Sequence, residues 1–177
     1  MIKVTHFLFI GALLVGALLM TQFVGSVSAK DGPKLLEFDT MIGVPRPFTG
    51  ATNAIRGVPG GGLPWVVRSA KGELKTDGKL EVEVKGLVFD PNDSDVINRG
   101  LANQNTVPQF RAIVSCLTKN GDAVTTVNVP TDPVPATVGL NAGDAKIEAQ
   151  LVLPSPCIAP IIFVTNPGGA WFAATGS

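Results

Sequence analysis

Apolar and charged positions alternate with a period of two along several stretches of this chain. The clearest stretch runs from Leu80 to Lys85, where a leucine and two valines alternate with two glutamates and a lysine. Such alternation is typical of a β-strand that buries one face, and the apolar pattern continues to Phe89. A second strand, 65–75, is expected before it, because an Asp-Gly pair marks a turn between the two. The pattern therefore predicts a β-hairpin.

The register of this hairpin follows from its apolar face. A three-residue loop sets Leu74 opposite Leu80, whereas a two-residue loop would set Leu74 opposite Glu81. The longer loop also sets Glu73 opposite Glu81, a pair of like charges that costs some stability on the exposed face. We expect the three-residue loop, because a matched buried face outweighs that repulsion.

A second hairpin is expected around Asn120-Gly121, which is the strongest short turn signal in the chain. Residues on both sides alternate, so one face of each strand is apolar. A two-residue loop at 120–121 pairs Val114 with Val127 and Ala112 with Val129. In this register, apolar residues of one strand lie opposite apolar residues of the other.

Four further stretches have the composition of strands. The stretch 145–153 alternates and predicts a half-buried strand, and 35–41 supplies another near the N-terminus. The stretches 161–164 and 170–173 are nearly unbroken apolar runs. Runs of this kind suit central strands that are covered on both faces.

Glycine and proline interrupt the chain throughout, and no window between them has helical periodicity. Two long connections, 43–64 and 90–108, separate the expected strands. Seven or eight strands without helices between them predict an all-β fold, an antiparallel β-sandwich. A closed β-barrel is the alternative.

The first 29 residues depart from this pattern and have the features of a signal peptide. Lys3 gives a positive start, 7–20 is apolar, and Val27-Ser28-Ala29 supplies small residues at a cleavage site. We therefore expect cleavage between Ala29 and Lys30, which leaves a single domain, 30–177. An uncleaved membrane anchor is the alternative, and no later segment has the length of a membrane span.

Composition narrows the chemistry of the expected domain. The only histidine, His6, lies in the leader, so 30–177 contains neither a Cys-His catalytic pair nor a Cys₂His₂ zinc site. Cys116 and Cys157 predict one disulfide in an exported chain, with two free thiols in a reducing compartment as the alternative. Acidic residues exceed basic ones by one after Lys3 is removed, which gives no electrostatic footprint for nucleic acid.

Two groups of residues are candidate binding sites. Four oxygen-bearing side chains in the second long connection could hold Ca²⁺, although such residues also gather in loops for their turn chemistry: Asp90, Asn92, Asp93 and Asp95. Arginines and tryptophans could line a recognition surface for a glycan or a protein, and the alternative is that both tryptophans are core residues: Arg46, Arg56, Trp65 and Trp171.

Catalysis by paired carboxylates stays open, because it needs no histidine. The candidate carboxylates lie on expected strands: Glu37, Asp39, Glu73, Glu81 and Glu83. Glu81 and Glu83 share the exposed face of an ordinary amphipathic strand. A hydrolase acting on extracellular polysaccharide is therefore the second functional hypothesis.

Four stretches resemble those of an uncharacterised group of small secreted bacterial proteins: GGGLPWVV (60–67), FRAIVSC (110–116), PCIAPIIFVT (156–165) and AWFAATG (170–176). The resemblance implies bacterial export and carries no activity, cofactor or ligand. Together with the residues, it predicts a secreted, disulfide-containing, non-enzymatic β-sandwich that acts as a structural or binding module of the cell exterior.

Overall fold

The computed structural model describes residues 32–175, so the expected cleavage site at Ala29 and Lys30 lies outside the described residues. Eight strands in this part of the chain have five or more residues: β1 (Lys34–Phe38), β4 (Ser69–Lys75), β5 (Lys79–Lys85), β8 (Gln109–Asn120), β9 (Ala123–Pro130), β12 (Ala145–Gln150), β13 (Ile158–Thr165) and β14 (Trp171–Thr175). The remaining elements are short: β2 (Met41–Gly43), β3 (Trp65–Val66), β6 (Val88–Phe89), α1 (Ser94–Asn98), β7 (Gln104–Asn105), β10 (Val134–Pro135) and β11 (Gly139–Leu140).

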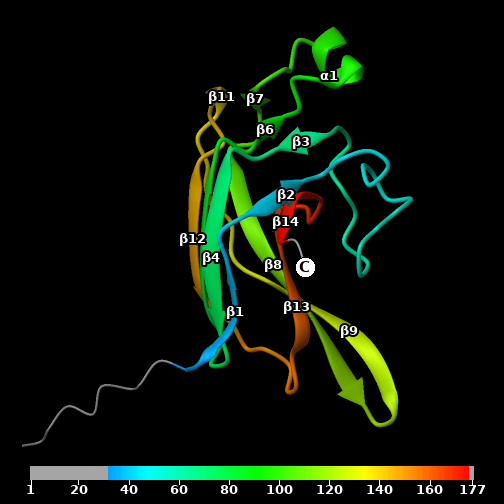
Figure 1. Cartoon of the computed structure of the whole chain (residues 1–177), viewed down its shortest axis with the longest axis vertical. Helices are drawn as coiled ribbons and strands as arrows, with labels where there is room; N and C mark the ends of the chain where they lie inside the picture. The colour runs from blue at the N-terminus through cyan, green and yellow to red at the C-terminus, as the bar shows by residue number, and fades with distance from the viewer. Residues whose placement is uncertain (1–31, 176–177) are drawn as a thin grey trace, which may run out of the picture. The chain divides into compact units, whose positions relative to one another are not determined.

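The longer strands form two antiparallel sheets that lie face to face (Figure 1). One sheet has the order β1-β4-β5-β12, and the other has the order β10-β8-β13-β14-β2, with β9 paired to β8. Fully buried residues from both sheets, among them Leu80, Val82, Val114 and Ile162, form one core. No sheet among the described residues closes on itself. The fold is thus the expected all-β antiparallel sandwich.

The register of the first hairpin is as the apolar pattern predicts. β4 and β5 place Leu74 opposite Leu80 and Glu73 opposite Glu81. Gly78 ends the three-residue loop with a φ of 89°. A side chain would be strained in that conformation, and a Cβ would also lie 1.8 Å from the carbonyl oxygen of Leu151.

The predicted register of the second hairpin is wrong by two residues. β8 and β9 pair Val114 with Val129 and Cys116 with Val127, so the loop is Gly121-Asp122. Gly121 has a φ of 62° and holds the first central position of the turn, where turns of the II′ type place glycine. The positive φ of Gly121 fits the first central position of the turn, and the strand pairing is therefore displaced from the predicted register.

Three expected segments are divided in the structure. The stretch 35–41 gives β1 and β2, which belong to different sheets, 65–75 gives β3 and β4, and 80–89 gives β5 and β6. β3 pairs instead with β6 in a separate two-stranded sheet. The connection 90–108, expected to be irregular, contains the one-turn helix α1. No described residue belongs to a helix with the length and hydropathy of a membrane span.

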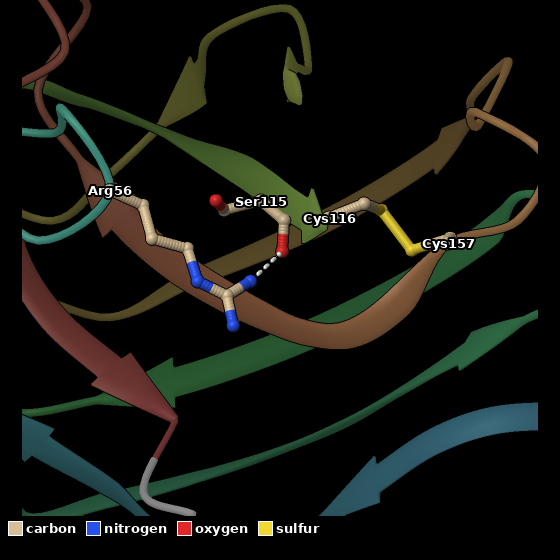
Figure 2. Close-up of a disulfide and its surroundings, with 4 residues drawn as sticks. All are labelled: Arg56, Ser115, Cys116 and Cys157. Atoms are coloured by element: carbon tan, nitrogen blue, oxygen red, sulfur yellow. Dashed lines mark hydrogen bonds between the residues drawn. A yellow bond between two sulfur atoms is a disulfide. The ribbon is translucent and has the colours of Figure 1, made fainter. Parts of the chain in front are cut away.

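Cys116 and Cys157 form the predicted disulfide, with their Cα atoms 4.9 Å apart. It joins β8 to the segment just before β13, and the Cys116 side chain is fully buried. Figure 2 shows the bridge beside the carbonyl of Ser115. Because disulfides persist in oxidising surroundings, the bond indicates an extracytoplasmic environment.

Candidate functional site

One end of the sandwich contains a pocket with an aromatic floor, which we call the Trp65 pocket. It has a volume of about 280 Å³. Its lining comes from five separate segments of the chain: Gly62, Leu63, Trp65, Phe89, Arg99, Val107 and Phe172. The ring contacts of Trp65 with Phe89 and with Phe172 join β3, β6 and β14, so the floor needs both the two-stranded β3–β6 sheet and the six-stranded sheet.

Three aromatic rings make the floor rigid. Trp65 lies opposite Phe89 in the β3–β6 ladder, and their ring centroids are 4.2 Å apart. Phe172 stacks on Trp65 with centroids 4.0 Å apart and an interplanar angle of 19°. Phe110 meets Phe172 edge to face and continues the cluster into the core. The floor is therefore an extension of the hydrophobic core that reaches the surface.

The glycine run 60–62 lets the long connection pass close over these rings. A Cβ on Gly61 would lie 2.9 Å from Cδ1 of Phe172 and 3.3 Å from Nε1 of Trp65. A Cβ on Gly60 would lie 2.0 Å from the carbonyl oxygen of Phe48. Gly62 has no such neighbour within 4 Å and lines the pocket. The run thus serves close packing beside the pocket.

Two hydrogen-bond donors of the pocket have no protein acceptor within residues 32–175. The indole N–H of Trp65 is one, and Trp65 lines the pocket although the residue as a whole is only 2% exposed. The guanidinium of Arg99 is the other, and it lies at the exposed C-terminal end of α1. An aromatic floor with two free donors can take an apolar group and a negatively charged one together.

The four residues expected to form a recognition surface are not brought together. Trp65 and Trp171 are both 2% exposed, as the core alternative expects. Trp171 neighbours Phe172 on β14, points to the opposite face of the sheet and packs against Phe163. Of the four, Trp65 alone lines the pocket.

The two arginines of that set have structural partners. Nε of Arg46 donates to Asp93 at 2.8 Å, and Nη2 donates to Asp95 at 2.6 Å. Nη1 of Arg56 donates to the carbonyl oxygen of Ser115 at 2.9 Å, as Figure 2 shows. Both arginines tie loops to other parts of the fold.

Three of the four residues proposed for Ca²⁺, the aspartates, already use side-chain oxygens in hydrogen bonds. Asp93 caps α1, with Oδ1 accepting from the backbone N–H groups of Asp95 and Val96. Its hydrogen bond with Arg46 lowers the pKa of the Asp93 carboxyl below its ordinary value. Oδ1 of Asp90 accepts from the backbone N–H of Asn92. No group of three metal-ligating side chains occurs among the residues that the structure describes.

The candidate carboxylates do share one surface, a shallow hollow of about 790 Å³ on the outer face of the four-stranded sheet. Its acidic lining consists of Glu37, Asp39, Glu73, Glu81 and Glu83. The strand registers align glutamates across all four strands: Glu37, Glu73, Glu81 and Glu148. We call this set the glutamate row. Like charges opposite one another destabilise a sheet unless they are compensated.

Lysines compensate the acidic groups of this face. Lys34 contacts Glu37 at 2.6 Å and Glu73 at 3.6 Å, and Lys146 pairs with Glu148 at the other edge. Glu83 contacts Lys85 at 2.8 Å and Lys71 at 3.1 Å.

These ion pairs determine the ionisation of Glu83. Hydrogen bonds from Lys85 and Lys71 lower its pKa from 4.5 to about 2. A general acid in a glycosidase needs a raised pKa, so the environment of Glu83 suits an ion pair and not proton donation.

Three residues of the Trp65 pocket were not among the sequence candidates: Phe89, Arg99 and Phe172. Phe89 ends an apolar strand and Phe172 lies in an apolar run, so their composition indicates only burial. No sequence pattern around Arg99 marks it as a binding residue.

The chain matches no family model, no curated protein and no solved structure. Its resemblance to small exported bacterial proteins therefore stays a prediction.

Proposed function

We propose that this protein is an exported, non-enzymatic module of the cell exterior that binds a small apolar carboxylate in the Trp65 pocket. One observation carries the proposal: the aromatic floor made by Trp65, Phe89 and Phe172 lies beside two donors that have no acceptor within the described part of the chain. The ligand's apolar body would cover the rings, and its carboxylate would accept hydrogen bonds from Arg99 and the indole of Trp65.

The size of the pocket supports a small ligand. Typical small-molecule sites have volumes of about 300–1,000 Å³, and this pocket lies just below that range at about 280 Å³. A planar guanidinium recognises a carboxylate with two parallel hydrogen bonds. Benzoate and hexanoate represent the aromatic and aliphatic members of this ligand class.

Export is supported by two independent features. The first 29 residues have the pattern of a cleavable leader. The disulfide Cys116–Cys157 requires an oxidising compartment to persist. Export from a bacterial cell agrees with the resemblance of four stretches of the sequence.

Tryptophan fluorescence tests ligand binding. The chain has two tryptophans, so Trp171→Phe leaves Trp65 as the only reporter. In that background we expect benzoate to change the emission in a saturable way, and neutral benzamide to bind about tenfold more weakly or worse. Absence of saturation, or equal affinity for benzoate and benzamide, would contradict the proposal.

Two arginine variants separate recognition from general charge effects. Arg99→Gln should weaken benzoate binding by about tenfold or more, because it removes the charged hydrogen bonds at the rim. Arg68→Gln is the matched control, since Arg68 is exposed and does not line the pocket. Equal losses in both variants would assign the effect to net charge instead of to Arg99.

A carboxylate-based hydrolase of extracellular polysaccharide is the second candidate. The convergence of five acidic residues on one hollow favours it, whereas their lysine partners and the low pKa of Glu83 disfavour it. A screen against polysaccharides with the wild-type protein and Glu81→Gln distinguishes the two. Turnover that disappears in a folded Glu81→Gln variant would replace the binding proposal.

A further inference from the structure

Strand β9 has one edge that no other strand within residues 32–175 covers. It pairs with β8 alone, from Ala123 opposite Asn120 to Pro130 opposite Ile113. Because the loop Gly121-Asp122 has two residues, Asn120 and Ala123 form a hydrogen-bonded pair, and such pairs alternate along the ladder. The backbone N–H and C=O groups of Val124, Thr126 and Asn128 therefore point to the open edge.

The other long edge strands carry charges that discourage pairing. β1 has Lys34 and Glu37, and β12 has Lys146 and Glu148. Natural proteins protect exposed sheet edges in this way, because an unprotected row of backbone groups is a template for another strand. β9 has the sequence AVTTVNVP and contains no charged residue at all. Its four β-branched residues in a row, from Val124 to Val127, favour extended structure.

The β8–β9 hairpin also projects from the rest of the sandwich. Figure 1 shows β9 at the lower right, where the tip of the hairpin extends past the four-stranded sheet and past the other strands of its own sheet. Val124 is 63% exposed, and Thr126 and Asn128 on the same face are exposed as well. Nδ2 of Asn128 donates to the carbonyl oxygen of Arg56 at 3.0 Å, and this side-chain contact leaves the backbone groups of the edge available to a second strand.

We propose that the open edge of β9 pairs with β9 of a second copy of this chain, antiparallel and centred on Thr126, so that the two six-stranded sheets become continuous. In this register Thr126 faces its own counterpart and Val124 faces Asn128, so neutral side chains meet along the whole contact. A strand that carries no charge is complementary to itself, whereas β1 or β12 would oppose like charges in some registers. The inference does not depend on the Trp65 pocket.

Sedimentation velocity of the protein, as its source cells process it, tests the proposal. We expect the weight-average mass to rise with concentration and to level off at twice the monomer mass. A protein that stays monomeric at every concentration would overturn the proposal. A mass that keeps rising past the dimer would also overturn it, because the two-fold contact closes on itself.

Matched variants locate the contact. Val124→Lys places a charge at the edge, and we expect it to raise the dimer dissociation constant about tenfold or more. Val138→Lys is the control, because Val138 is similarly exposed, at 56%, and lies outside β9. An unchanged dissociation constant for Val124→Lys, or an equal rise for Val138→Lys, would refute pairing at β9.

A proline variant tests the backbone contribution separately. The N–H of Thr126 points away from β8, so Thr126→Pro removes a donor of the open edge and leaves the β8–β9 ladder intact. We expect this variant to retain the wild-type circular dichroism spectrum and to be monomeric. A dimer of wild-type affinity in Thr126→Pro would show that β9 backbone groups do not form the contact.

Discussion

Arg56 and Ser115 lie 59 residues apart in the sequence, yet the guanidinium of one donates to the backbone carbonyl of the other at 2.9 Å. The carbonyl oxygen of Arg56 in turn accepts from Nδ2 of Asn128 on β9, at 3.0 Å. Arg56 thus fastens the long connection 44–64 to two strands of the six-stranded sheet, directly beside the disulfide (Figure 2). The sequence suggested only a binding role for Arg56, and these two hydrogen bonds give it a structural role.

Removal of this guanidinium should loosen the connection. We expect Arg56→Ala to lower the free energy of unfolding by about 1 kcal/mol, the typical value of one partly exposed charged hydrogen bond. Urea unfolding measures the loss. Arg56 has a φ of 50°, so Arg56→Gly should be less destabilising than Arg56→Ala, because glycine adopts that conformation without a Cβ clash. The opposite order would indicate that backbone strain is unimportant here.

The disulfide should contribute substantially to stability. It closes a loop across a sequence separation of 41 residues, and loops of that size correspond to about 4 kcal/mol in the chain-entropy model. We expect Cys116→Ala/Cys157→Ala to lose about 2–4 kcal/mol of unfolding free energy. Reductant should lower the urea midpoint of the wild type and leave that of the double variant unchanged. A reductant effect on the variant would point to another cause.

The contrast between the two hairpins shows what an apolar pattern can determine. For β4 and β5, the competing loop lengths differ by one residue, which sets Leu74 against either Leu80 or Glu81, and the pattern selects one. For β8 and β9, the predicted and observed registers differ by two residues, and both bury the same faces. Only the glycine conformation at the turn distinguishes them, and hydrophobicity carries no information about it.

Neither the Trp65 pocket nor α1 could be predicted from the sequence pattern, and the reasons differ. The pocket joins five segments, so its residues become neighbours only through long-range strand pairing. α1 has five residues, too few for helical periodicity to be visible. Its start is encoded locally by the Asp93 cap, which also explains why acidic residues gather in that loop.

Two buried hydroxyl groups differ in their partners and should respond differently to removal. Oγ of Ser115 is buried without a hydrogen-bond partner, so Ser115→Ala should leave stability unchanged or raise it by about 1 kcal/mol. Oγ1 of Thr131 accepts from the N–H of Ala112 at 3.0 Å and donates to the carbonyl of Asp132 at 2.9 Å. Thr131→Val should cost about 1–3 kcal/mol, because it leaves a buried N–H unpaired. Urea unfolding of both variants tests this contrast, and a larger loss for Ser115→Ala would contradict it.

The loop around Asp93 should be indifferent to calcium. Arg46 and the start of α1 already occupy the Asp93 carboxylate, so we expect the same melting midpoint in excess Ca²⁺ and in chelator. Asp93→Ala should lower stability in both solutions by about 1 kcal/mol, the usual cost of a lost helix cap. A higher midpoint in Ca²⁺ that disappears in Asp93→Ala would instead support the metal site expected from the sequence.

The ion pairs of Glu83 with Lys71 and Lys85 should make the free energy of unfolding depend on pH. The pKa of Glu83 is about 2 in the folded protein and 4.5 ordinarily, so the folded state binds this proton less readily than the unfolded state. The resulting stabilisation is fully present above pH 4.5, decreases as the pH falls from 4.5 to about 2, and is absent below that. Glu83→Gln should therefore be less stable than the wild type at neutral pH, and the difference should vanish near pH 2. Urea midpoints of both proteins across this range measure the effect, and a difference that does not change with pH would show that Lys71 and Lys85 do not act through the charge of Glu83.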